Sequence, residues 1–235
     1  MKGTVYCVGV GPGDPELLTL KARRLIRETR IVALPGEAPR ETVAYRIAVQ
    51  AVPELAEKEL VALPMPMLRD RALLAREHRR GAERLEAIAD TGENVVFLTL
   101  GDPTVYCTFS YLQRLLEADG CPVELVSGVP SFCAAAARLG IPLGEWDQEI
   151  HILPAVHRAE DIPALKGTLV LMKSAGRMRE VKALLRAGER EVRAVLNCGM
   201  ENETVCSSLE EIPEDAGYFS LIIAREPEGG SGNAR

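Results

Sequence analysis

The 235-residue sequence has little of what metal, disulfide-bonded and membrane proteins depend on. Its three histidines have no HxxxH or HxH spacing, so we expect no metal site. No two of the six cysteines form a CxxC pair, and most lie in apolar runs, which predicts reduced, structural cysteines. No apolar run approaches the roughly 20 residues that span a bilayer, and no signal peptide precedes the first strand. These absences predict a cytoplasmic protein without membrane contact.

The sequence also lacks an excess of positive charge, with 28 Lys and Arg against 34 Asp and Glu. The formal net charge is −6 and the isoelectric point is about 5.3, which argues against nucleic acid as a partner. Any anionic ligand must therefore meet Arg and Lys that are gathered locally.

Strands and helices alternate along almost the whole chain, a pattern that predicts a largely parallel sheet between helices. In the first half we expect strands at 5–10, 30–34, 95–100 and 123–126, and helices at 15–29, 42–52, 70–89 and 108–118. In the second half we expect helices at 131–140 and 177–187, and strands at 149–155, 167–173, 191–198, 201–208 and 218–226, the last two antiparallel. The predicted fold class is α/β, with an N-terminal domain over 1–126, a C-terminal domain over 127–226 and a disordered tail over 227–235.

The stretch "TVYCVGVGPGDPELLTL" combines a strand, a glycine-rich turn and the start of a helix. It resembles the GxGxxG turn of dinucleotide-binding folds, which aims backbone N–H groups at a pyrophosphate. Pro12 has no N–H to offer, and Asp14 places a negative charge where a phosphate would lie. The second strand ends in "ALPG" without an acidic residue for a ribose, and no GxxxxGK[ST] motif occurs. An NAD-dependent oxidoreductase is therefore a weak alternative.

A ligand that needs close backbone approach but carries no phosphate fits this turn better. S-adenosylmethionine is such a ligand, because its sulfonium is positive and favours carboxylate and carbonyl oxygens. A second loop, "LGDP" at 100–103, supplies the carboxylate of Asp102 at the end of a buried strand, where ligands of α/β sheets bind.

Three segments, "VGVGPGDPELLTLKA", "FLTLGDPTVYCTFSYL" and "SGVPSFCAAAARLGIPL", closely resemble the tetrapyrrole (corrin and porphyrin) methyltransferase family. The resemblance runs from about residue 3 to residue 225. "TLGDPTVYCTF" and "AAAARLGIPL" favour the branch that methylates carbon 20 of precorrin-2 or cobalt-factor II in cobalamin biosynthesis. Uroporphyrinogen-III methyltransferases usually read GGDP in the corresponding loop.

The resemblance implies two α/β domains with S-adenosylmethionine in a cleft between them, and a homodimer. The implied cofactor contacts are Pro12, Gly101, Asp102, Val105, Ser131, Phe132, Met172, Cys198 and Ser220. Val105, Met172 and Cys198 can also be read as ordinary packing residues. One departure from the family pattern is that proline and serine have traded places in "SGVPS", so only Ser131 keeps its hydroxyl at the pair that touches the cofactor.

The implied substrate is a flat macrocycle with about eight carboxylates, which an acidic protein can bind only through clustered cations. The candidate contacts are Lys21, Arg40, Arg69, Arg71, Lys173 and Arg177, each of which can also be a solvated surface charge. Methyl transfer from sulfur to a nucleophilic meso carbon needs mainly positioning. Asp102 and Tyr106 are the candidates for a base that removes the proton afterwards.

Other functions stay open at this point. They are methylation of corrin carbon 11 or 17, methylation of uroporphyrinogen III, diphthamide-forming methylation of a protein, and a non-catalytic module that senses S-adenosylmethionine. The sequence does not distinguish a metal-free substrate from one that already holds cobalt.

Overall fold

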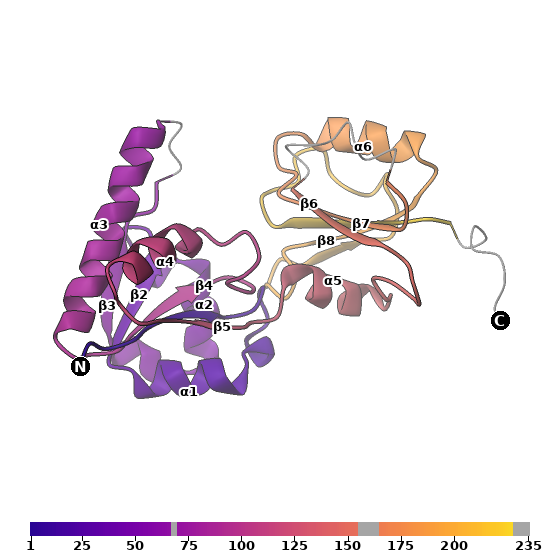
Figure 1. The fold of residues 1–235 in the computed structure, drawn as a ribbon. Helices are drawn as coiled ribbons and strands as arrows, with labels where there is room; N and C mark the ends of the chain where they lie inside the picture. The colour runs from indigo at the N-terminus through magenta and orange to yellow at the C-terminus, as the bar shows by residue number, and fades with distance from the viewer. Residues whose placement is uncertain (67–69, 155–164, 228–235) are drawn as a thin grey trace. The chain divides into compact units, whose positions relative to one another are not determined.

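The computed structural model describes residues 1–66, 70–154 and 165–227. The chain divides into two compact units, Met1–Pro130 and Ser131–Arg235 (Figure 1). Residues 127–130 belong with the first unit, where the Gly128 N–H donates a hydrogen bond to Asp102.

The first unit is built on a five-stranded sheet in which every pair of neighbouring strands is parallel, in the order β3-β2-β4-β1-β5. The strands are β1 Val5–Gly9, β2 Ile31–Pro35, β3 Glu59–Leu63, β4 Val95–Thr99 and β5 Val123–Val126. Both faces of such a sheet are covered by helices, which is why its strands are nearly continuous runs of apolar residues.

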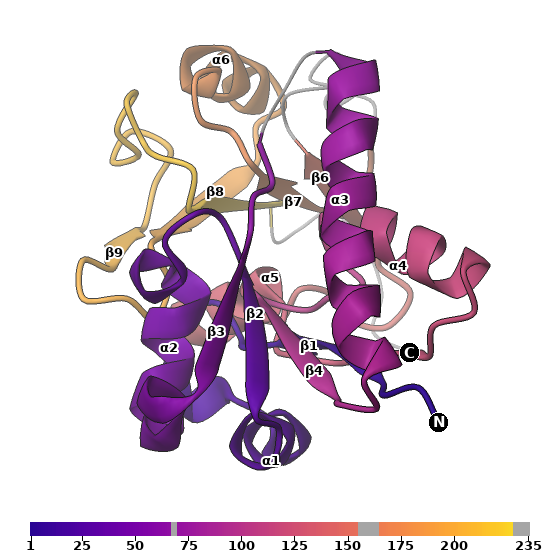
Figure 2. The same ribbon diagram turned by 90° about the vertical axis from the view of Figure 1, so that its left-hand side faces the viewer.

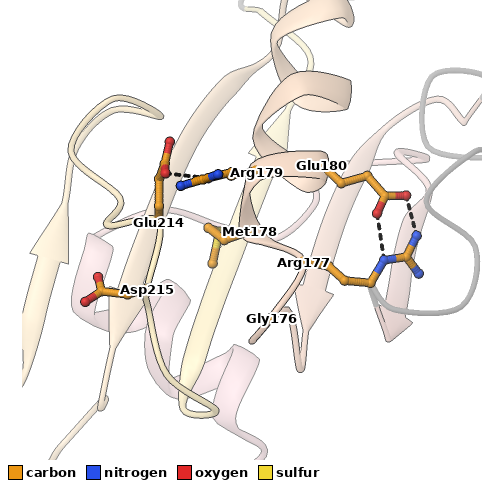
Figure 3. A pocket seen from close by; sticks show the side chains of 7 residues that line it. All are labelled: Gly176, Arg177, Met178, Arg179, Glu180, Glu214 and Asp215. Atoms are coloured by element: carbon orange, nitrogen blue, oxygen red, sulfur yellow. Dashed lines mark hydrogen bonds and ion pairs between the residues drawn. The ribbon is translucent and has the colours of Figure 1, made fainter.

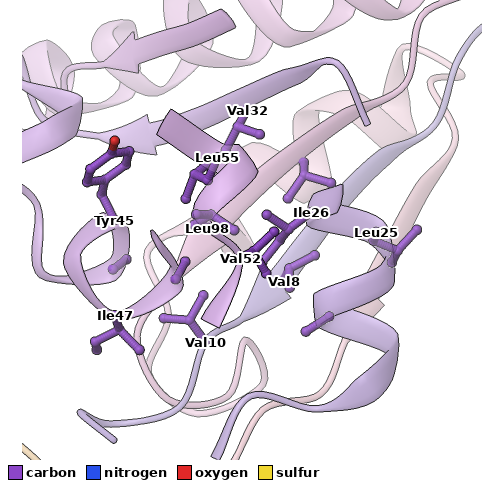
Figure 4. Close-up of a cluster of buried hydrophobic side chains, with 14 of the residues drawn as sticks. Val8, Val10, Leu25, Ile26, Val32, Tyr45, Ile47, Val52, Leu55 and Leu98 are labelled. Carbon is purple, nitrogen blue, oxygen red and sulfur yellow. The ribbon is translucent and has the colours of Figure 1, made fainter. Parts of the chain in front are cut away.

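Helices α1 (Leu20–Glu28) and α2 (Val43–Ala51) cover one face of this sheet, and α3 (Arg71–Asp90) and α4 (Phe109–Ala118) cover the other (Figure 2). On the α1/α2 face, side chains of both helices pack against the strands around Val8 and Leu98 (Figure 4). On the α3/α4 face, the rings of Phe97 and Phe109 lie 4.9 Å apart. Burying each such side chain contributes roughly 1.5–3 kcal/mol to folding.

The connections of β1 and β4 create a gap in the covering helices. The two strands are neighbours, yet the chain leaves β1 toward α1 on one face and β4 toward α4 on the opposite face. In open α/β sheets this topological switch point is where ligands bind, outside the carboxyl ends of the strands.

One local expectation for the first unit was wrong, and one strand was missed. The helix expected over 15–29 is split into a 3-10 turn, η1 (Pro15–Leu17), and α1, because Leu18 is extended and the Thr19 side chain caps α1 by accepting from Ala22 N. Strand β3 was not predicted at all. Two more 3-10 turns, η2 (Pro39–Glu41) and η3 (Pro53–Glu57), flank α2.

The second unit contains a mixed five-stranded sheet in the order β6-β7-β10-β8-β9. Its strands are β6 Ile150–Pro154, β7 Thr168–Met172, β8 Glu191–Leu196, β9 Thr204–Cys206 and β10 Ser220–Arg225. Strands β6 and β7 are parallel, whereas β9 and β10 each pair antiparallel with β8 and not with each other. Helices α5 (Ser131–Leu139) and α6 (Met178–Ala187) cover opposite faces of this sheet (Figure 1).

The sequence led us to expect no disulfide, no membrane-spanning helix and no metal site, and the structure can be examined for these features in the described residues. All six cysteines are free thiols. Within residues 1–66, 70–154 and 165–227, no helix combines the length and apolar character that crossing a bilayer requires. In the same part of the chain, no group of three or more His, Cys, Asp or Glu side chains could hold a metal ion. Apart from Pro227, the tail expected to be disordered lies outside the described residues.

Candidate functional site

The glycine loops that follow β1 and β4 are hydrogen-bonded to each other. Gly11 N donates to Gly101 O at 3.3 Å, and Gly101 N donates to Gly11 O at 2.8 Å. Both glycines have left-handed backbones, with φ of 77° and 62°, which side chains adopt only at a cost. The two loops singled out in the sequence therefore form one structure at the switch point.

The loop that follows β5 approaches the same point through backbone atoms alone. A Cβ on Gly9 would lie 2.4 Å from Gly101 O, and a Cβ on Gly128 would lie 2.2 Å from the same oxygen. Neither position can carry a side chain unless the backbone shifts. Three strand ends thus meet in a cradle made of glycine backbone.

The Asp102 carboxylate holds part of this cradle in place through hydrogen bonds. One carboxylate oxygen accepts hydrogen bonds from the backbone N–H of Thr104 at 2.8 Å and from the Thr104 hydroxyl, and the other accepts from Gly128 N at 3.1 Å. The Ser127 side chain also hydrogen-bonds to this carboxylate. Burial alone would raise the pKa of Asp102, but these hydrogen bonds outweigh it and hold the pKa below the ordinary value of 3.8.

The cradle does not suit a pyrophosphate. Neither loop, over 9–14 and 99–105, contains Lys, Arg or His. The N–H groups of Gly11 and Gly101 are used between the loops, and Pro12 has none. What the cradle offers is carbonyl oxygens and an ionised carboxylate, which favour a positively charged ligand.

The other predicted residues of the first unit lie on the same two loops. Pro12 is buried next to Gly11, Val105 is half-buried, and Tyr106 is 48% exposed. Tyr106 has a φ of 48°, an unusual value for a residue with a side chain. The structure therefore brings Pro12, Gly101, Asp102, Val105 and Tyr106 to one edge of the sheet.

Three predicted residues of the second unit also come together. Met172 ends β7 and pairs with Leu221, and Ser220 begins β10 and pairs with Leu196 at the end of β8. Cys198 follows β8 by two residues, so all three lie at one edge of the second sheet. Ser220 is buried and its hydroxyl donates to Gly217 O at 2.6 Å.

Ser131 and Phe132 form the first turn of α5, where the second unit begins. Phe132 is buried and Ser131 is half-buried. The structure thus places every predicted cofactor residue at a strand end, in the loop that follows a strand, or at a helix start. Their roles stay predictions.

The predicted substrate cations have varied surroundings. Lys21 pairs with Glu124, while Arg40 donates to the Tyr45 hydroxyl at 2.8 Å and to Ala56 O at 2.9 Å. Arg71 is exposed at the start of α3, and Arg69 lies outside the described residues. Lys173 follows β7 with a φ of 57°, and its ammonium lies 6.0 Å from the centre of the Tyr218 ring. The hydrogen bonds of Arg40 indicate that this side chain holds the fold together.

An open pocket of about 450 Å³ lies at the start of α6 (Figure 3). Its two arginines are both matched by glutamates. Arg177 Nε donates to Glu180 at 2.7 Å, and Arg179 Nε donates to Glu214 at 2.6 Å. With Asp215 also in its lining, this pocket lacks the positive charge that a polycarboxylate would need.

Two features of the site were missed in the sequence. Gly9 and Gly128 were not identified as close-contact positions, although Gly9 ends β1 and Gly128 follows β5 by two residues. The ion pair between Arg138 and Glu203 was also missed, because no sequence pattern relates positions so far apart.

Similarity to known proteins identifies the family of the chain. Residues 4–213 match the family described as Tetrapyrrole (Corrin/Porphyrin) Methylases. The chain is a member of the tetrapyrrole methylase family. Among similar proteins, a "Probable cobalt-precorrin-2 C(20)-methyltransferase" of Methanocaldococcus jannaschii is 33% identical over 94% of this chain and 95% of its own length.

Two further tetrapyrrole methylases are similar over almost the whole chain. A "Cobalt-precorrin-2 C(20)-methyltransferase" of Salmonella typhimurium is 33% identical over 96% of this chain and 98% of its own. A uroporphyrin-III C-methyltransferase of Thermus thermophilus, solved in complex with S-adenosylhomocysteine, is 29% identical with a TM-score of 0.68, over 95% of this chain and 98% of its own. A native form from the same organism is 30% identical with a TM-score of 0.69, over the same shares of the two chains.

Family membership confirms three predictions. The family itself is the one that the sequence resembles, the architecture is two α/β units, and the enzyme class is a C-methyltransferase that uses S-adenosylmethionine. The NAD-dependent alternative is wrong.

Proposed function

We propose that this tetrapyrrole methylase transfers a methyl group from S-adenosylmethionine to carbon 20 of precorrin-2 or cobalt-factor II, a step of cobalamin biosynthesis. The observation that carries the proposal is the 33% identity, over nearly the full length of both chains, to two proteins named for carbon-20 methylation. Both of these names specify a cobalt-containing precorrin, which favours the cobalt-loaded substrate.

The residues present fit S-adenosylmethionine. The group supplies a methyl bound to positively charged sulfur, which leaves as a neutral sulfide. The glycine cradle offers oxygens without competing cations. A Cβ on Gly9 or Gly128 would collide with Gly101 O and so displace the backbone of the cradle. In our proposal Pro12, Gly101 and Val105 contact the methyl donor from the first unit. The contacts from the second unit are Ser131, Phe132, Met172, Cys198 and Ser220.

The work of the chain itself is positioning. A new carbon–carbon bond forms from the electron pair of the conjugated meso carbon while the methyl–sulfur bond breaks in line with it. Holding two reactants in such alignment can account for several orders of magnitude in rate. Asp102 contributes by holding its own loop to the loop that follows β5, through hydrogen bonds that its oxygens accept. Its lowered pKa makes it a weak base.

If a side chain removes the proton from the methylated carbon, Tyr106 is the better candidate. It lies on the same loop as Asp102 and is 48% exposed. Lys21, Arg71 and Lys173 are the described cations that we propose for the carboxylates of the macrocycle. Free cysteines fit a reducing cytoplasm, and a homodimer stays a prediction.

A second candidate is methylation of uroporphyrinogen III. Its support is the similarity to the Thermus thermophilus enzyme at 29% identity. The sequence "TLGDP", in place of the usual GGDP, favours carbon-20 methylation.

The test is an anaerobic incubation of the purified protein with S-adenosylmethionine carrying a radioactive methyl group. Precorrin-2, cobalt-factor II and uroporphyrinogen III are offered as separate acceptors. We expect label in the first two and fastest transfer to the cobalt-loaded one. Label in uroporphyrinogen III alone would favour the second candidate, and label in none would favour a non-catalytic binding module.

A further inference from the structure

The loop over 197–203, which carries Cys198, has an unusual backbone. Asn197 and Gly199 both have left-handed φ values, 53° and 74°, on either side of Cys198. Asparagine adopts this conformation more readily than other residues with side chains, but it still costs free energy that neighbouring contacts must offset. The shape of this loop therefore depends on what holds it.

Glu203 is the side chain that holds the loop. One of its carboxylate oxygens accepts a hydrogen bond from Gly199 N at 2.8 Å, directly beside Cys198. Turns within the loop add bonds from Met200 N to Asn197 O at 2.9 Å and from Glu203 N to Met200 O at 3.0 Å. Among these bonds, the one to Gly199 N is the charge-assisted bond, the stronger kind.

The second oxygen of Glu203 ties the loop to helix α5. It pairs with Arg138 Nε, in the last turn of α5. Helix α5 begins with Ser131 and Phe132. A single carboxylate thus links the Cys198 loop to the helix that carries two more of the proposed cofactor contacts.

The Glu203 contact differs from the surface ion pairs of the same unit. The Glu203 side chain is 17% exposed, whereas Glu214, which pairs with Arg179, is 58% exposed. Charges that are partly withdrawn from water are screened less, and exposed pairs contribute little.

From this arrangement we propose that Glu203 is a positioning residue for S-adenosylmethionine. It acts by holding the backbone at Gly199 so that Cys198 is presented to the ligand in one fixed geometry. The inference rests on the proposed function, in which Cys198 contacts the methyl donor.

The test measures the dissociation constant of S-adenosylhomocysteine by calorimetry, well below the unfolding temperature. Glu203→Ala removes both hydrogen bonds, and we expect affinity to fall about tenfold or more, the range for a lost charge-assisted hydrogen bond. Glu203→Gln keeps an oxygen that can accept from Gly199 N, so we expect a loss of about threefold or less. Arg138→Met removes the ion pair, in which the arginine side chain is 57% exposed, and leaves the hydrogen bond from Gly199 N in place. We therefore expect a similarly small effect.

Glu214→Ala is the matched control, because it removes a glutamate–arginine pair of the same unit away from the loop, and its affinity should equal that of the wild type. Kinetics give an independent readout: Glu203→Ala should raise KM for S-adenosylmethionine and leave kcat at saturation nearly unchanged. A merely structural role would lower the melting temperature without this split and without rescue by glutamine.

The outcomes separate the inference from the proposed function. If the wild type binds S-adenosylhomocysteine and Glu203→Ala binds it equally well, the positioning role is wrong while the function stands. If Arg138→Met is as damaging as Glu203→Ala, the ion pair is what matters and the role assigned to Gly199 N is wrong. If the wild type does not bind at all, the proposed function itself fails.

Discussion

Replacing Asp102 with asparagine tests whether this carboxylate holds the loop after β4 to the loop after β5. Asp102 is buried, and its two oxygens accept from Thr104 and Gly128. Asparagine keeps one acceptor oxygen and turns the other into an NH2 donor, which then faces an N–H donor. Losing one charge-assisted hydrogen bond and leaving a buried donor unpaired costs about 2–4 kcal/mol.

For a unit of this size, a loss of that order lowers the melting temperature by about 10 °C. The measurement is thermal unfolding followed by circular dichroism at pH 7. Asp119→Asn is the control, since Asp119 pairs with Arg79 on the surface, and we expect a shift of no more than about 2 °C. A wild-type melting temperature in Asp102→Asn would show that the carboxylate does not hold the loops.

The same variant gives a pH test with a definite sign. The pKa of Asp102 is lowered in the folded protein, so its ionised form stabilises the fold above the ordinary pKa of 3.8. That stabilisation is lost as the pH falls through the lower, folded-state pKa. The difference in unfolding free energy between wild type and Asp102→Asn should stay constant from pH 7 to about pH 5 and shrink below about pH 4. A difference that grows toward acid would contradict the assignment.

Three further substitutions test other parts of the structure. Gly128→Ala would place a Cβ 2.2 Å from Gly101 O, so we expect binding of S-adenosylhomocysteine to weaken at least about tenfold, whereas Gly217→Ala, with open space around it, should bind normally. Ser174→Ala should raise the unfolding free energy by about 1 kcal/mol, because the buried Ser174 hydroxyl has no hydrogen-bond partner among the described residues. A loss of stability would mean that the hydroxyl does form a hydrogen bond in the folded protein. Arg40→Met should lower the unfolding free energy by about 1–2 kcal/mol in urea titrations, since Arg40 makes two internal hydrogen bonds; an effect confined to KM for the tetrapyrrole would instead support substrate binding.

Much of the fold could be predicted because its strands are apolar runs bounded by glycine or proline. The strand at 123–126 and the long helix from Asp70 agree with the structure to within about a residue. The short strand β3 was not predicted because its sequence, "ELVAL", lies between a proline-led turn and a proline-interrupted segment. Its conformation there is decided by pairing with β2.

The gathering of Met172, Cys198 and Ser220 at one sheet edge could be expected from the family resemblance alone. No local pattern predicts that β10 lies between β7 and β8. The hydrogen-bond partner of Asp102 and the ion-pair partner of Glu203 could not be predicted from the sequence for the same reason. Gly128 and Arg138 are distant from them in sequence, and hydrogen bonds of this kind follow from the tertiary structure.

The most direct test of the account is the position of the new methyl group. Anaerobic incubation of the protein with cobalt-factor II and 13C-methyl S-adenosylmethionine, followed by carbon NMR of the isolated product, should show one labelled methyl on carbon 20. A labelled methyl on any other carbon, or an unlabelled macrocycle from protein that binds S-adenosylhomocysteine, would contradict the proposed function.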